Sequence, residues 1–303
     1  ITDDDAVNPS AGTVDDTFGA RLGANGPVYA VEFNTAGQAY VAGDFTLVNG
    51  GLINRIARLN FDGTLDQGFN PGSGAASNVW AVAVRSDGTI LLGGDFASVN
   101  GVDRAGVAVL NTDGSVSQIF NPGSGANSTV FAVDELSDGT FLIGGSFTSY
   151  RGVAAGGLIR LNPNGTVFTN FNVGTGVAGT VRAIAETSTG QLLVGGDFSA
   201  FNGNTLFSKI VRLNTDGSVD PSFTPGTSAD RAVLDLAQQP DGKIVVVGDF
   251  IRYGGLSKNG IVRLRPDGTL DDTFATGTGA NGAVRAVARR AAGQLLIVGD
   301  FTT

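Results

Sequence analysis

The chain has 303 residues, of which 42% are hydrophobic, and a formal net charge of −9. It contains no Cys, His or Met, which excludes a disulfide framework, a thiolate nucleophile and the commonest zinc ligands. The acidic balance argues against nucleic-acid binding, and the lack of a long apolar run argues against a membrane span. The missing Met also suggests a processed form or part of a longer protein. We predict no metal and no cofactor.

An internal repeat runs through the chain in order. The phenylalanine near the end of each unit recurs at Phe18, Phe69, Phe120, Phe171, Phe223 and Phe274. Spacings of this kind, near 50 residues, are typical of β-propellers and large repeat arrays. The 47 glycines, with only 9 prolines, suit the tight turns of such a repeat better than disorder.

Residues 1–27 contain "GTVDDTF" (12–18), which matches "GTLDDTF" (268–274), the expected fourth strand of a unit. Repeats then start near 28, 79, 130, 181, 233 and 284, and the last stops at Thr303 after two strands. We therefore expect residues 1–27 to complete the last unit, within one domain spanning 1–303. The weak point is the third strand, which would come from residues 1–8 and contains three consecutive aspartates.

One unit, 79–129, shows the expected elements. Strands are predicted over 79–84, 89–96, 105–111 and 115–120, with turns at 86–88 and 112–114 and a loop at 97–104. The Asp-Gly pairs, such as Asp87-Gly88, indicate tight type I′ hairpins. No sustained helical pattern is present. The sequence predicts an all-β fold, a six-bladed β-propeller with four-stranded antiparallel blades, buried on both faces, and a closing blade shared between the N- and C-terminal segments.

Written out, the repeat contains "V-x-A-V", "DGT-x-L-x-G-G-D-F", "N-G", "I-x-R-L-N-x-D-G-S/T-x-D" and Phe-Asn-Pro-Gly. In these motifs the chain resembles the bacterial delta-60 repeat family of β-propellers along nearly its whole length. The resemblance implies a secreted or surface-exposed bacterial protein, and it brings no catalytic residues.

An acidic position follows each second strand, at Asp44, Asp95, Ser146, Asp197, Asp249 and Asp300. A ring of carboxylates could bind a cation such as Ca²⁺. We favour a structural role, in which each side chain accepts hydrogen bonds from backbone N–H groups of the next loop. Arginines in the third strand (Arg58, Arg160, Arg212, Arg263) are available as charge partners.

Function is expected where the repeat is broken. The second residue of each inner strand varies and is predicted at the mouth of the axial channel: Tyr29, Trp80, Phe131, Arg182, Leu234 and Arg285. Aromatic faces with arginines suit a sugar or an anionic group, although such residues also fill gaps between blades. A second candidate set lies in the loops, at Tyr150, Arg151, Arg252 and Tyr253, where scattered surface residues are the alternative.

The leading hypothesis is a non-enzymatic binding or adhesion module outside the cell, with a protein or glycan ligand at the loop face. A structural spacer or filament subunit is a second hypothesis. A glycosidase or lyase using carboxylates is a third, with Glu32, Asp134, Glu135, Glu186 and Asp235 as the least regular candidates.

Overall fold

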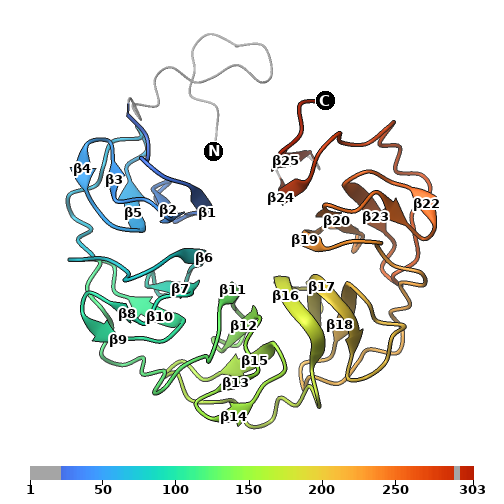
Figure 1. Cartoon of the computed structure of the whole chain (residues 1–303), viewed down its shortest axis with the longest axis horizontal. Coiled ribbons are helices and arrows are strands. Elements are labelled where there is room, and N and C mark those ends of the chain that lie inside the picture. Colours follow the sequence, from blue (N-terminus) through green and yellow to red (C-terminus); the bar gives the residue numbers. More distant parts are fainter. Residues whose placement is uncertain (1–21, 290–293) are drawn as a thin grey trace.

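The computed structural model describes residues 22–289 and 294–303, and these form antiparallel sheets arranged around a central axis (Figure 1). The strands nearest the axis are β1 (Val28–Phe33), β6 (Val79–Val84), β11 (Val130–Glu135), β16 (Val177–Glu186), β19 (Val233–Gln238) and β24 (Val284–Arg289). The second strands are β2 (Ala39–Gly43), β7 (Ile90–Gly94), β12 (Phe141–Gly145), β17 (Leu192–Phe201), β20 (Ile244–Gly248) and β25 (Leu295–Gly299). The third strands are β5 (Ile56–Leu59), β10 (Val107–Leu110), β15 (Leu158–Leu161), β18 (Ile210–Leu213) and β23 (Ile261–Leu264).

Each set of first, second and third strands forms one blade, numbered 1 to 5 in chain order, and β24 with β25 forms the described part of blade 6. In four blades a small outer hairpin joins the second strand to the third. These hairpins are β3 (Leu47–Val48) with β4 (Gly51–Leu52), β8 (Ser98–Val99) with β9 (Val102–Asp103), β13 (Ser149–Tyr150) with β14 (Val153–Ala154), and β21 (Arg252–Tyr253) with β22 (Leu256–Ser257). Blade 4 has no such hairpin, because β16 and β17 themselves extend outward. Within the described residues no helix has the length and apolar character needed to cross a membrane.

The sheets of blades 1 to 5 have three strands, which corrects the prediction of four. The expected fourth strand pairs only through a single bridge, for example Leu59 with Leu65 and Leu213 with Val219. In blade 1 the Asp66 side chain then accepts the N–H of Gly68 at 2.8 Å. Because this Asx turn bends the backbone immediately after the bridge, the pairing cannot continue.

The hairpin turns also differ from the predicted type I′. In the first turn of blade 2 the Gly88 N–H donates to the Arg85 carbonyl, and Gly88, with φ of 81°, is left-handed whereas Asp87 is not. This is a type I turn followed by a glycine bulge. The Asp87 carboxylate accepts the N–H of Thr89 at 2.9 Å, which favours the type I conformation over type I′.

The hydrophobic core lies between blades, as the apolar runs predicted. All five residues of β7 are buried, and Tyr40 and Ile56 of blade 1 belong to the same cluster as Ile90 and Leu92 of blade 2. Each fully buried Leu or Ile contributes about 1.5–3 kcal/mol. Neighbouring blades are therefore joined mainly by apolar contacts.

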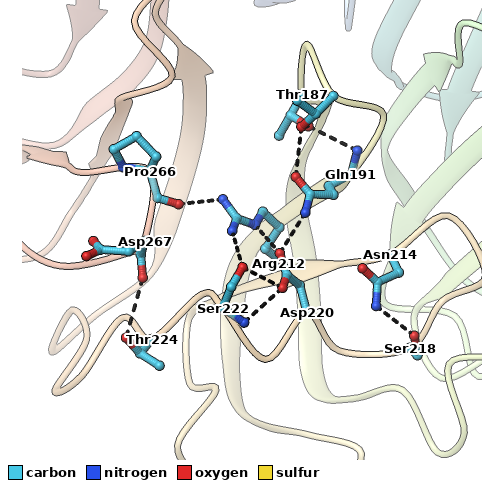
Figure 2. A network of polar contacts seen from close by, with 11 residues as sticks. Thr187, Gln191, Arg212, Asn214, Ser218, Asp220, Ser222, Thr224, Pro266 and Asp267 are labelled. Atoms are coloured by element: carbon cyan, nitrogen blue, oxygen red, sulfur yellow. Dashed lines mark hydrogen bonds and ion pairs between the residues drawn. The ribbon is translucent and has the colours of Figure 1, made fainter.

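A buried arginine adds a polar clamp between blades (Figure 2). Arg212 on β18 pairs with Asp220 at 2.7 Å and donates to the Pro266 carbonyl of blade 5 at 2.5 Å. Arg58 and Arg263 pair in the same way with Asp66 and Asp271. Three of the third-strand arginines thus bind carboxylates of the fourth segment, whereas Arg160 binds Asp138 in the first turn of blade 3. Among the described residues, none of the four pairs with the acidic positions that follow the second strands, which corrects that expectation.

The predicted closure of blade 6 by residues 1–27 falls largely outside the described residues. What is described of blade 6 is a two-stranded sheet. The first and last described strands carry exposed apolar residues, Val31 and Phe33 on β1 and Leu296 and Val298 on β25.

Candidate functional site

Each inner strand contains a β-bulge at the same position of the repeat. In β6 the pairing to β7 shifts between Val79 and Ala81, which leaves Trp80 as the extra residue. The same shift occurs at Tyr29, Phe131, Arg182, Leu234 and Arg285. A bulge redirects the side chain of its extra residue, so the sheet pleat does not decide where these side chains point.

Four of these bulge residues form a continuous stack across four blades. The Tyr29 and Trp80 rings lie 4.1 Å apart and nearly parallel, and Trp80 meets Phe131 edge-on at 5.5 Å. The Arg182 guanidinium lies over the Phe131 ring at 4.0 Å from its centroid. We call Tyr29, Trp80, Phe131 and Arg182 the axial stack. The structure thus brings together four of the six residues that the sequence placed at the mouth.

The guanidinium of Arg182 ends the axial stack without a partner for its donors. Among the described residues it makes no hydrogen bond or ion pair, although Asp197 and Asp249 are close enough to favour its charge. Partial burial outweighs these charges and lowers the pKa of Arg182, which stays charged at neutral pH. Its ring contact fixes the plane of the guanidinium, which leaves an oriented set of donors beside the aromatic rings.

The remaining bulge residues do not join the axial stack. Arg285 is bound by Asp300, with Nε at 2.9 Å from Oδ1, and Leu234 is half-buried. Hydrogen bonds and charge from Arg285 hold the pKa of Asp300 below its ordinary value. At this position the predicted mouth therefore carries aromatic rings in blades 1 to 3 and arginines in blades 4 and 6, with Leu234 between the arginines in blade 5.

The side chains at the acidic positions (Asp44, Asp95, Ser146, Asp197, Asp249 and Asp300), which we call the acidic ring, do not cap the following loops. Its aspartates are exposed. Asp95 accepts weak hydrogen bonds from Trp80 and Asn78, and Asp197 binds Lys209 at 2.6 Å. No backbone N–H donates to an acidic-ring side chain within the described residues, which corrects the predicted cap. What fixes the preceding glycine is the residue before the first strand: a Cβ on Gly94 would lie 2.2 Å from the Asn78 carbonyl oxygen. This close contact between the backbones of the first and second strands explains the glycine of the motif.

Two cations beside the acidic ring were missed by sequence reasoning. Arg55 and Lys209 precede the third strand with positive φ, both 64°, where three other blades have glycine. They contact Asp44 at 3.5 Å and Asp197 at 2.6 Å. A left-handed non-glycine residue is unfavourable and needs a compensating contact. The signal was present in the sequence as a basic residue at a glycine position of the repeat.

The loop candidates separate into buried and exposed residues. Tyr150 and Tyr253 are 0% and 1% exposed and belong to interblade core clusters, so the expectation of surface aromatic rings there is corrected. They replace the buried Val48 and Val99 of the other blades. Arg151 is exposed and donates to the Asn121 carbonyl at 2.7 Å, whereas the exposed Arg252 side chain has no polar partner among the described residues.

The irregular carboxylates of the inner strands have structural partners. Glu135 binds Arg85 and accepts the Ser86 N–H, and Glu186 accepts the Ser137 N–H, both at 2.6 Å. These contacts join each inner strand to the first turn of the preceding blade.

Two further carboxylates, Asp134 and Asp235, are half-buried on the inner strands. Burial, with the negative charges of Glu186 and Glu32, raises the pKa of Asp134 to about 7. Burial also raises the pKa of Asp235 to about 6, although it accepts backbone N–H groups from Leu236 and Val287 at 2.8 Å. In the part of the chain that the structure describes, no three His, Cys, Asp or Glu side chains converge in a way that could hold a metal ion.

Comparison with known proteins gives the fold and the family. The structure is similar to the WD40 β-propeller domain of Doa1 (TM-score 0.57, 15% identity, 88% of this chain and 73% of that chain). It is also similar to virginiamycin B lyase from Staphylococcus aureus (0.55, 14%, 89% and 76%). A third similar structure is PorZ, a bacterial surface component of the type-IX secretion system of Porphyromonas gingivalis (0.53, 14%, 89% and 37%). At these identities the likeness shows the β-propeller fold alone.

No curated protein matches the chain in sequence. A family model described as a domain of unknown function (DUF5122) β-propeller matches residues 37–69, 85–116, 136–171, 187–223 and 239–274, which together exceed half of the chain. Each match begins near the first turn of a blade and reaches the fourth segment, so it covers the repeat derived above. The chain belongs to the DUF5122 β-propeller family.

Proposed function

We propose that this chain is a non-enzymatic binding or adhesion module of a bacterial surface or secreted protein, with a protein or glycan ligand held at the axial stack. The observation that carries this proposal is the unpartnered guanidinium of Arg182 at the end of a rigid series of three aromatic rings. Such an arrangement offers ring surface and oriented donors together, which suits a sugar or an apolar segment carrying an acceptor group.

The aromatic rings are only partly covered by one another. Tyr29 is 38% exposed, and Trp80 and Phe131 are half-buried. Their stacking uses the faces between blades, and their outer edges remain for a ligand. Because the rings are already immobilised, a ligand would lose little further side-chain entropy on binding, and this favours affinity.

The extracellular setting rests on the resemblance to delta-60 repeats. PorZ supports it in one respect, since a β-propeller of similar fold is present in a bacterial surface component. We infer that the delta-60 name describes the same repeats as the DUF5122 match.

A closed ring of six blades is part of the proposal. Residues 1–27 would supply the missing strands of blade 6 and cover the exposed apolar residues on β1 and β25. If the same residues were covered by a second molecule, the chain would be a filament subunit or spacer. Light scattering separates the two: a closed ring gives a mass independent of concentration, and a filament gives a mass that rises with concentration.

The carboxylate-based glycosidase or lyase is the weaker alternative. Glu135, Glu186 and Asp235 are hydrogen-bonded to backbone groups that hold neighbouring blades together. A catalytic acid needs to reach a substrate, and these three carboxylates are engaged in the fold.

The test is a ligand screen followed by substitution. The chain is screened against an array of neutral and acidic glycans and against a displayed peptide library. For the best ligand, Trp80→Ala and Arg182→Ala are expected to weaken binding by about tenfold or more, the loss of one good contact. Arg151→Ala is the matched control, because that guanidinium binds a loop carbonyl far along the blade. A ligand bound equally by both stack variants, or no ligand in either screen, would refute the proposal.

A further inference from the structure

The boundary between blades 4 and 5 departs from the repeat in its outer loops. At the other four described boundaries a glycine brings the loop between blades against the second residue before the third strand: Gly74, Gly125, Gly176 and Gly279. A Cβ at these glycines would lie 2.1–2.4 Å from a carbonyl oxygen of that residue. Ser228 stands at this position between blades 4 and 5. Because Ser228 has a Cβ, which would clash with the Ser208 carbonyl oxygen, the same close approach is not possible at this boundary.

A second departure removes a side chain from the same place. In blade 4 the Asn202 side chain accepts the Thr175 N–H at 3.2 Å and fills the space above Gly174, where a Cβ would lie 2.5 Å from it. Blades 1 and 2 also have asparagine there, and blade 5 has Gly254. A Cβ on Gly226, the counterpart of Gly174, would meet nothing within 4 Å. The space that asparagine fills elsewhere is therefore open at this boundary.

These two substitutions leave a pocket of about 640 Å³ between the loops of blades 4 and 5. Its lining includes Thr205, Leu206, Ser208, Thr227, Ser228, Asp230 and Arg252. This volume is within the range of small-molecule sites.

Two buried hydroxyl groups, one in the pocket lining and one behind it, lack a hydrogen-bond partner among the described residues. Ser228 lines the pocket and is 6% exposed, and Tyr253 behind it is 1% exposed. The Tyr253 hydroxyl is close enough to Ser228 to interact with it, but the two are not aligned as a hydrogen bond. The equivalent Tyr150 of blade 3 donates to the Gly165 carbonyl at 3.1 Å. Buried hydroxyls are almost always paired, so these two call for a ligand or solvent partner.

We propose that this pocket binds a short neutral carbohydrate. Hydroxyl groups dominate the polar lining, and each both donates and accepts, as the hydroxyls of a sugar do. Asp230 accepts two loop N–H groups through Oδ1, at 3.0 Å each, which leaves Oδ2 for a ligand hydroxyl. Arg252 supplies donors, and its charge offsets that of Asp230, so the pocket favours no net charge. Leu206, 71% exposed, offers an apolar surface for the C–H face of a sugar ring.

The test uses cellobiose, chitobiose, maltotriose and lactose as probes, titrated to millimolar concentration and followed by amide NMR shifts and calorimetry. At least one probe is expected to bind and to shift amides of residues 205–208 and 226–230. Ser228→Ala removes only the hydroxyl and should weaken that binding by about tenfold. Gly254→Asn restores the residue of blades 1, 2 and 4, should fill the pocket from its rim, and should abolish binding in a chain that still folds.

The controls separate this site from the axial stack. Arg182→Ala should leave binding of the sugar unchanged, and Tyr150→Phe should also leave it unchanged. The proposal is overturned if no probe binds, if Gly254→Asn binds as the unchanged chain does, or if the sugar is lost with Arg182→Ala instead. Loss of sugar binding in Arg182→Ala would place the sugar at the axial stack. Absence of binding by any of the four probes would overturn the pocket proposal and leave the axial proposal standing.

Discussion

Arg212 binds Asp220 of its own blade and the Pro266 carbonyl of the next blade, and this clamp offers a quantitative test of how polar contacts stabilise the fold. Asp220 is 4% exposed and Arg212 is 7% exposed, so each charge depends on the other. Removing one member of a buried ion pair costs about 3–5 kcal/mol. Arg212→Val would in addition leave the Pro266 carbonyl without its donor. Asp220 would retain the N–H and Oγ of Ser222. We therefore expect a loss of about 3 kcal/mol in the free energy of unfolding for Arg212→Val, and a similar loss for Asp220→Ser.

Blade 2 supplies the matched control, because it has Val109 and Ser117 at these two positions and folds without the ion pair. The double variant Arg212→Val with Asp220→Ser copies blade 2. Since it leaves no buried charge unpaired, its loss should be smaller than the summed single losses by about 2–3 kcal/mol.

Urea unfolding measured through Trp80, the single tryptophan, and through circular dichroism gives these free energies where the two signals coincide. Burial opposes ionisation of Asp220, but hydrogen bonds from Ser222 and Arg212 hold its pKa below the ordinary value. The stabilisation is thus present above the ordinary aspartate range and is lost as the pH falls through the lowered pKa. If the unfolding free energy lost by the double variant equals the sum of the two single losses to within about 0.5 kcal/mol at pH 7, the coupling is refuted.

Three further changes test other parts of the fold. Asp134 titrates near pH 7 when folded and near 3.8 when unfolded, so the folded state holds an extra proton between these values and stability falls as the pH rises through them. Asp134→Asn should therefore be more stable than the unchanged chain at pH 8, by about 1–2 kcal/mol after a discount for solvent screening, and should show no such gain at pH 4. Equal urea midpoints at pH 8 would count against it. Gly94→Ala should cost about 3 kcal/mol, because its Cβ meets the Asn78 carbonyl at 2.2 Å, and a thermal midpoint unchanged from the parent would contradict that contact. Lys209→Gly relieves a left-handed residue but releases Asp197, so calorimetry should show a change within about 1 kcal/mol.

Sequence alone determined the local elements. Strand positions, the turns and the blade repeat depend on residues within one hairpin, and alternating or continuous apolar runs specify which faces are buried. The predicted first strand of blade 2, 79–84, coincides with β6 for this reason. The length of strand pairing in the fourth segment was overestimated. An Asx turn at Asp66 competes with that pairing, and its formation depends on side-chain geometry.

Tertiary structure alone decided which side chains meet. Arg212 could have paired with the acidic ring or with the fourth segment, and in the folded chain it binds Asp220 of its own blade and the Pro266 carbonyl of the next blade (Figure 2). Tyr150 looks like a surface residue in sequence, yet it occupies the core position of a valine in blade 2. The Pro266 carbonyl that Arg212 reaches lies about one repeat away along the chain. The distance in space between these two groups is fixed by blade packing and is not encoded in any local pattern.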